Sequence, residues 1–163
     1  QAHSAEAPQL PDIEDRAGVL FLESNHPEVD GHEAGSPQLF RAHINQNLCF
    51  LMVDATDTPI GFATCGVLDG ALHLYELAIV PEHGGKGLGK ALIETVCAES
   101  KSRGLDAVTL STLTDVAWNG PFYERVGFRS LDDDELSPGL HLVKNHEADI
   151  GLTHRCIMRR EIK

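Results

Sequence analysis

The sequence YELAIVPEHGGKGLGKAL at residues 75–92 runs from an apolar segment, through a glycine-dense turn, into a helical pattern. Residues 71–80 predict a long strand, and residues 88–103 predict a helix that ends at Gly104. Glycines let backbone amides approach an anion, and the start of a helix adds unpaired N–H groups and the positive end of its dipole. The turn therefore predicts a diphosphate site, near the charges of Lys86 and Lys90.

The segments on either side predict a mixed α/β sheet. Asp69 and Gly70 predict a tight hairpin turn between two of its strands. The helix at residues 88–103 is expected to bury Leu88, Leu92 and Val96, together with the Ala91 and Thr95 positions. Residues 25–37 predict a loop, further helices are expected at 8–23, 37–46, 121–126 and 136–148, and further strands at 48–53, 60–68, 107–111, 128–131 and 153–160.

Length and charge narrow the class of protein. A chain of 163 residues suits one domain, and its net charge of −12 argues against nucleic acid as a partner. It has no apolar run of roughly 20 residues, so no membrane partner is expected. The four cysteines show no paired spacing and the histidines show no HxxxH or HExxH pattern, which predicts free thiols, no metal site and a cytoplasmic location.

Other nucleotide-binding patterns fit the turn less well. Gly84, Gly89 and Lys90 match the spacing of a P-loop, but Ala91 stands where Ser or Thr would hold magnesium. The dinucleotide-binding spacing GxGxxG does not follow a first strand, and no matching acidic residue stands about 20 positions later. A glycine-rich surface turn with solvated lysines is the remaining alternative.

A second segment, VAWNGPFYERVGF at residues 116–128, places an Asn before a short helix that ends in Gly-Phe. With the turn, it resembles the GNAT superfamily of acyltransferases, whose first motif is Gln or Arg, two residues, Gly, one residue, and Gly or Ala. Gly87 and Gly89 match both later positions, whereas Gly84 replaces the Gln or Arg. The resemblance covers residues 48–131. Within the superfamily, the chain is similar to a bacterial-type subgroup whose acceptor is undefined.

The resemblance implies a single GNAT domain over residues 1–163. Its fold would be α/β, with a central, mostly antiparallel, splayed sheet of six or seven strands flanked by helices. Acetyl-CoA would be the acyl donor, with its pantetheine arm pairing as a pseudo-strand in the splay. The implied binding residues are Leu77, Ala78, Ile79, Val80, Gly84, Gly85, Lys86, Gly87, Leu88, Gly89, Lys90, Asn119, Phe122 and Tyr123.

The same resemblance assigns two catalytic residues. Tyr123 is expected to protonate the departing thiolate, or else to pack its ring under the coenzyme arm without transferring a proton. Glu76 is expected to act as the general base, or else to bind substrate without titrating. Strand alternation would place Glu76 on one face with Leu72, Leu74 and Ala78. Asn119 would contact the pantetheine, and its alternative role is to cap the short helix.

The expected reaction is direct transfer of the acetyl group to a primary amine of a small molecule, without an acyl-enzyme. The alternative is a non-catalytic acyl-CoA-binding regulatory module, which Gly84 favours. The acidic charge weakly favours a cationic acceptor, and a homodimer is possible. His26 and His32 are candidates for a substrate lid, and His146 with Glu147 for the acceptor pocket.

Overall fold

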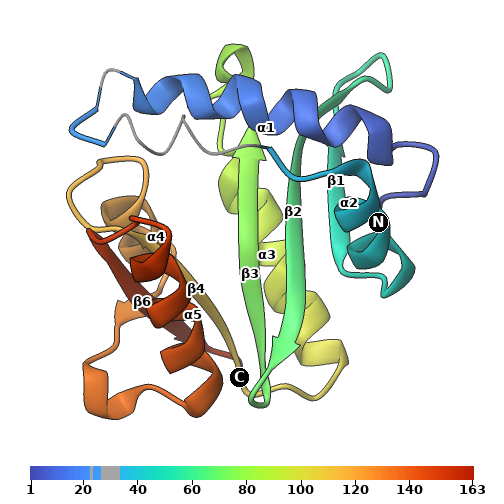
Figure 1. Cartoon of the computed structure of the whole chain (residues 1–163). Coiled ribbons are helices and arrows are strands. Elements are labelled where there is room, and N and C mark those ends of the chain that lie inside the picture. The colour runs from blue at the N-terminus through green and yellow to red at the C-terminus, as the bar shows by residue number, and fades with distance from the viewer. Residues whose placement is uncertain (23, 27–33) are drawn as a thin grey trace. The chain divides into compact units, whose positions relative to one another are not determined.

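The computed structural model describes residues 1–22, 24–26 and 34–163 (Figure 1). The loop predicted at residues 25–37 falls partly outside them, as does the lid candidate His32. The elements are η1 (Ala7–Gln9), α1 (Leu10–Gly18), η2 (Val19–Phe21), α2 (Pro37–Asn45), β1 (Cys49–Val53), β2 (Pro59–Leu68), β3 (Ala71–Ile79), η4 (Pro81–His83), α3 (Leu88–Ser102), β4 (Ala107–Leu113), α4 (Gly120–Arg125), β5 (Arg129–Ser130), η5 (Asp133–Glu135), α5 (Pro138–Asp149) and β6 (Arg155–Glu161).

The strands form one six-stranded sheet in the order β1-β2-β3-β4-β6-β5. β1 pairs antiparallel with β2, and β6 pairs antiparallel with both β4 and β5. β3 pairs parallel with β4, from Leu72 opposite Val108 to Leu74 opposite Leu110. This mixed, mostly antiparallel sheet with flanking helices confirms the predicted fold class. In the described part of the chain, no helix has the length and apolar character needed to span a membrane.

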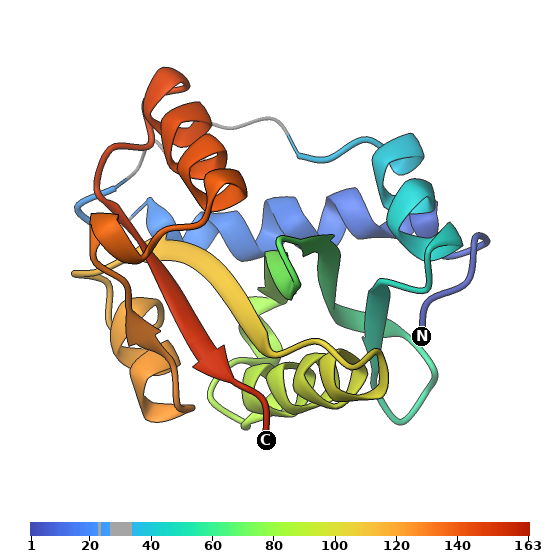
Figure 2. The same ribbon diagram turned by 90° about the horizontal axis from the view of Figure 1, so that it is seen from below.

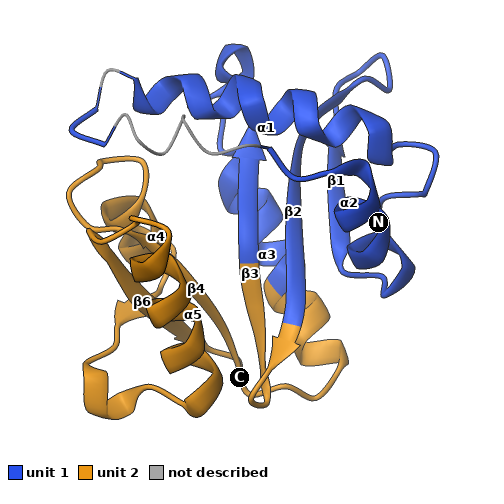
Figure 3. Ribbon diagram, in the orientation of Figure 1, with its two compact units in different colours: residues 1–66, 75–96 blue, residues 67–74, 97–163 orange. Residues whose placement is uncertain are grey.

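The chain forms two compact units, which Figure 3 colours separately. Unit 1 comprises residues 1–66 and 75–96, and unit 2 comprises residues 67–74 and 97–163. The chain passes from one unit to the other within β2, β3 and α3. The single domain expected over residues 1–163 stays a prediction.

In unit 1, α1 and α2 lie on one face of the strands and α3 on the other (Figures 1 and 2). Ser36 caps α2, because its Oγ accepts from the Leu39 N–H at 3.3 Å, and Pro37 supplies the first helical residue. The inner side of α2 packs Phe40 edge-on against Phe62 of β2, with ring centroids 5.2 Å apart. Burial of each such side chain contributes about 1.5–3 kcal/mol to the free energy of unfolding.

In unit 2, the Asp69–Gly70 hairpin turn holds the start of α5. Both turn residues have positive φ, 48° and 79°, which confirms the tight turn predicted from the sequence. The carboxylate of Asp69 accepts from the Gly139 N–H at 2.6 Å. A hydrogen bond from the Ser137 side chain, with help from the Gly139 N–H, holds the pKa of Asp69 below its usual value. A Cβ on Gly139 would lie 2.5 Å from Leu68 Cδ1, so α5 approaches the hairpin closely at a residue without a side chain.

Two expectations about helices are wrong in detail. Ala91 and Thr95 are exposed, although they were expected on the inner side of α3. The N-terminal helix does not run unbroken from residue 8 to 23, because α1 ends at Gly18 and a 3-10 turn follows. Leu92 and Val96 are buried as expected, and Ile93, Cys97 and Ser100 complete the buried side of α3.

Candidate functional site

The glycine-rich turn follows the end of β3 in unit 1. The Val80 N–H still pairs with the Ile60 carbonyl at 2.9 Å, and the turn begins directly after η4. Gly85 and Gly87 have φ of 71° and 79°, and no heavy atom beyond their chain neighbours lies within 4 Å of where a Cβ would stand. α3 begins at Leu88, so the N–H groups of its first turn have no partner within the helix. An open, left-handed turn that leads into a helix start suits an anion.

Gly84, at the first motif position, has the ordinary φ of −61°. A Cβ there would lie only 3.1 Å from the carbonyl oxygen of Pro81. This contact is tight, because a relaxed contact between a carbon and an oxygen is longer. The turn geometry therefore gives a physical reason for the absence of a side chain at this position.

Acidic and basic side chains both lie near the turn. Glu82 pairs with Arg16 of α1 through two hydrogen bonds of 3.2 Å each. A backbone hydrogen bond, with help from Arg16, holds the pKa of Glu82 below its usual value. Lys86 Nζ donates to the Glu82 carbonyl at 3.1 Å, and Lys90 is exposed on α3. Both ammonium groups are thus available beside the open amides.

β3 departs from regular alternation over Tyr75–Ile79. The Tyr75 ring occupies the place of a Gly66 side chain, whose Cβ would lie 2.7 Å from Tyr75 Cε2. Ile79 occupies the place of a Gly61 side chain, whose Cβ would lie 2.3 Å from Ile79 Cδ1. Gly61 and Gly66 are five residues apart and face opposite sides of β2, so Tyr75 and Ile79 also face opposite sides. Residues four apart on a regular strand share a side, so a one-residue irregularity lies between them.

The irregularity corrects the expectation for Glu76. Strict alternation was expected to place Glu76 on one face with Leu72, Leu74 and Ala78, and alternation does not hold across this stretch. Ala78 belongs to the buried cluster that also contains Leu10 and Ile13 of α1 and Phe40 of α2. Glu76 is half-buried, and its role as a base stays a prediction.

In unit 2, the side chain of Asn119 lies just before α4. Its Oδ1 accepts from the Thr112 hydroxyl of β4 at 2.9 Å. Its side chain makes no capping hydrogen bond to α4, so the capping alternative is wrong. Nδ2 is buried and has no partner among the residues that the structure describes. Such a group destabilises the fold unless a ligand or water accepts from it, which fits the pantetheine contact expected from the sequence.

Tyr123 of α4 is buried, with 8% of its surface exposed. Its ring meets those of Phe122 and Phe128 edge-on, with centroids 5.1 Å and 5.7 Å away. This packing holds the ring in place, and the contact with the coenzyme arm considered for the ring stays a prediction. The proton transfer expected of its hydroxyl stays a prediction, as does the cofactor contact expected of Phe122.

A polar cluster on the α5 side of unit 2 was missed in the sequence. Arg155 of β6 pairs with Glu147 at 3.0 Å and donates to the Ser111 carbonyl at 2.7 Å, while the Ser111 hydroxyl donates to Glu147 at 2.6 Å. His73 is buried and bonds Thr109 Oγ1 at 2.9 Å; burial, with a contribution from Arg155, lowers its pKa to about 4. The signal in the sequence was the spacing of Thr109 and Ser111, because two polar residues two positions apart on a strand face the same side. Glu147 is therefore engaged with Arg155, and His146 beside it is exposed.

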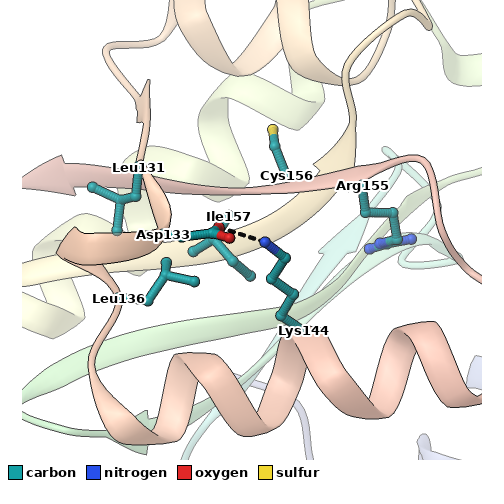
Figure 4. Close-up of a pocket in the computed structure, with 7 residues that line it drawn as sticks. All are labelled: Leu131, Asp133, Leu136, Lys144, Arg155, Cys156 and Ile157. Atoms are coloured by element: carbon teal, nitrogen blue, oxygen red, sulfur yellow. Dashed lines mark hydrogen bonds and ion pairs between the residues drawn. The ribbon is translucent and has the colours of Figure 1, made fainter.

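A small pocket of about 90 Å³ lies beside this cluster, within unit 2 (Figure 4). Lys144 reaches across it to pair with Asp133. The volume corresponds to about three waters, which is far too small for a coenzyme. The pocket is lined by Leu131, Asp133, Leu136, Lys144, Arg155, Cys156 and Ile157.

All four cysteines are free thiols, as expected. Burial raises the pKa of Cys49 to about 11 and also raises that of Cys156, so both favour the thiol over the thiolate at neutral pH. Within the described ranges, no group of three His, Cys, Asp or Glu side chains is arranged to hold a metal ion. The expectation of no metal stays a prediction.

A family model described as Acetyltransferase (GNAT) family matches residues 17–128, which is more than half of the chain. The chain belongs to the GNAT family of acetyltransferases. The match contains the glycine-rich turn and the Asn119–Tyr123 segment, the two features from which the resemblance was drawn. It confirms the predicted family.

One curated protein is similar to this chain in part of its sequence, and two solved structures share its fold. Glucosamine 6-phosphate N-acetyltransferase of Trypanosoma brucei brucei is 40% identical over 58 residues, which is 36% of this chain and 37% of that protein. N-acetylglutamate synthase from Neisseria gonorrhoeae, complexed with coenzyme A and N-acetyl-glutamate, has a TM-score of 0.73 at 19% identity and covers all of this chain, but only 34% of its own chain is matched. PaiA N-acetyltransferase from Thermoplasma acidophilum, complexed with coenzyme A, has a TM-score of 0.72 at 18% identity, with 98% and 95% of the two chains covered.

Proposed function

We propose that this GNAT protein transfers the acetyl group of acetyl-CoA directly to a primary amine of a small molecule. The observation that carries the proposal is the open turn at Gly85–Gly89, with its left-handed glycines and the helix start behind it. The family match and the coenzyme A in the related structures support the choice of ligand.

Several residues would bind the coenzyme. Amides of Gly85–Gly89 and the start of α3 would hold the diphosphate, with Lys86 and Lys90 adding charge. The backbone of Leu77–Val80 would pair with the pantetheine arm. The buried Nδ2 of Asn119 suits the pantetheine arm, because a pantetheine carbonyl would accept a hydrogen bond from it.

The chemistry needs one group that takes a proton and one that gives a proton. An ammonium must lose a proton before its nitrogen attacks the thioester carbonyl, and we assign that proton to Glu76, directly or through a water. When the carbon–sulfur bond breaks, the thiolate takes a proton from Tyr123, and the nitrogen loses its second proton to the phenolate. One proton is released overall for each amide formed.

Direct transfer requires no enzyme nucleophile. The raised pKa values of Cys49 and Cys156 support this route, because a protonated thiol is a poor nucleophile. The proposed acceptor is a small-molecule amine. The homodimer and the cytoplasmic location stay predictions.

The second candidate is a regulatory module that binds acyl-CoA without transferring the acyl group. The glycine at position 84 supports it, because a Gln or Arg side chain is missing there. Calorimetry with acetyl-CoA, followed by thiol release on a panel of primary amines, separates the two. Binding with amine-dependent thiol release supports the enzyme, binding without release supports the module, and no binding at millimolar acetyl-CoA overturns both.

A further inference from the structure

Tyr75 is the exposed residue of β3, whose other residues are buried or half-buried. The four residues before it in β3 are 0–3% exposed and Ala78 is 1% exposed, whereas Tyr75 is 49% exposed. Its ring lies against Gly66 of β2, where any side chain would collide with it. Part of an aromatic ring is therefore exposed at the middle of β3, directly before Glu76.

His43 of α2 stands beside that ring, with the two ring centroids 5.7 Å apart and the planes tilted by 52°. Its Nδ1 lies 2.8 Å from the carbonyl oxygen of Cys65. A carbonyl oxygen only accepts, so Nδ1 carries the proton and donates it. In the neutral ring, Nε2 is then the acceptor nitrogen, and no hydrogen bond from a described residue reaches it.

We propose that His43 and Tyr75 form the acceptor-binding subsite, and that the acceptor carries its primary ammonium on an apolar or aromatic stem. This inference rests on the proposed function. An aromatic face attracts a cation, and a lone pair on Nε2 accepts from an N–H group. Both features suit an ammonium group, which is a cation with several N–H donors. Neither supplies the positive charge that would bind an acceptor with an anionic group, such as an amino sugar phosphate.

Gly66 matters for the shape of this subsite. Because Gly66 has no side chain, the Tyr75 ring occupies the space that a Cβ at position 66 would fill. An alanine at position 66 would push the ring away while keeping both Tyr75 and His43. This substitution tests the position of the ring separately from its chemistry.

The test measures kcat and KM on 2-phenylethylamine, 1,5-diaminopentane, taurine and glucosamine 6-phosphate at saturating acetyl-CoA. Wild type is expected to prefer the first two by at least about tenfold in kcat/KM. Tyr75→Ala, His43→Asn and Gly66→Ala are each expected to raise the KM of the preferred amine about tenfold, with a smaller change in kcat. His43→Asn keeps a donor for the Cys65 carbonyl but removes Nε2.

Two controls separate binding of the amine from loss of the fold. His141→Asn changes an exposed histidine of α5 and is expected to leave every KM unchanged. The acetyl-CoA Kd of each variant, measured by calorimetry, is expected to stay within about twofold of wild type. If Tyr75→Ala has lost acetyl-CoA binding, it is replaced by Tyr75→Leu, which keeps much of the volume but removes the π face.

The outcomes are distinguishable. Preference for taurine or glucosamine 6-phosphate, or an unchanged KM in Tyr75→Ala and His43→Asn, overturns this inference and leaves the proposed function standing. Acetyl-CoA binding without acetylation of any of the four amines overturns the subsite and counts against the proposed enzyme.

Discussion

The Thr112 hydroxyl donates to Asn119 Oδ1 at 2.9 Å, and this bond orients the amide so that Nδ2 is buried without a partner among the described residues. An Asp at position 119 would replace the N–H donors with acceptors. We expect Asn119→Asp to weaken acetyl-CoA binding about tenfold, since one hydrogen bond contributes about 1–1.5 kcal/mol. Calorimetry measures the Kd, and an unchanged value would remove Asn119 from the coenzyme site.

Tyr123 is expected to act through its hydroxyl, because its ring is already fixed by Phe122 and Phe128. Tyr123→Phe keeps the packing and removes the acid. We expect kcat to fall about 100-fold, within the range for general acid catalysis, while the Kd of acetyl-CoA stays the same. Phe128→Leu is the control. It should lower the melting temperature while changing kcat little. If Tyr123→Phe turns over as fast as wild type, the hydroxyl is not the acid and the role of Tyr123 is packing.

Glu76 is expected to be the group that must be ionised for the amine to lose its proton. Glu76→Gln keeps the shape but has no basic oxygen. We therefore expect a lower rate at neutral pH and loss of the acidic limb from the plot of log kcat against pH. If wild type and variant share the same profile, the base is another group.

Alanine substitutions at two left-handed glycines, one in the turn and one outside it, are expected to differ in their effect on acetyl-CoA binding. Gly85 has φ 71° and Gly151 has φ 88°, and at both residues the space that a Cβ would fill is open. An alanine at either place costs about 1–2 kcal/mol of stability. Only Gly85→Ala should also weaken acetyl-CoA binding, by calorimetry. Similar Kd values for both variants would place the diphosphate elsewhere.

His73 makes stability depend on pH. Its pKa is lowered from 6.5 to about 4 by burial and Arg155, so folding favours the neutral ring. The stabilisation is complete above the unfolded pKa and is lost as pH falls from about 6.5 through 4, by up to about 3 kcal/mol. Urea unfolding at pH 7.5 and 4.5 measures the loss, which should be smaller in His73→Gln than in wild type. A loss of equal size in both proteins would assign the acid sensitivity to other groups.

The features predicted correctly from the sequence are those that depend on residue type and on neighbours in the chain. Positive φ at Asp69, Gly70, Gly85 and Gly87 follows from residue types that tolerate it, and most of the helices and strands follow from the period of their apolar residues. The family followed from two motifs, the turn and the Asn119–Tyr123 segment, since each depends on neighbours in the chain.

The sequence by itself therefore determined the order of the elements, the glycine-rich turn and the family. Only the tertiary structure decided that Tyr75 and Ile79 face opposite sides, that Asn119 bonds Thr112 instead of capping α4, and that His43 reaches the Cys65 carbonyl. Ala91 and Thr95 show the same limit, because helical period alone does not specify which side of α3 meets the sheet. The physical reason is that these features depend on contacts between residues far apart in the chain, and such contacts exist only once the strands have paired.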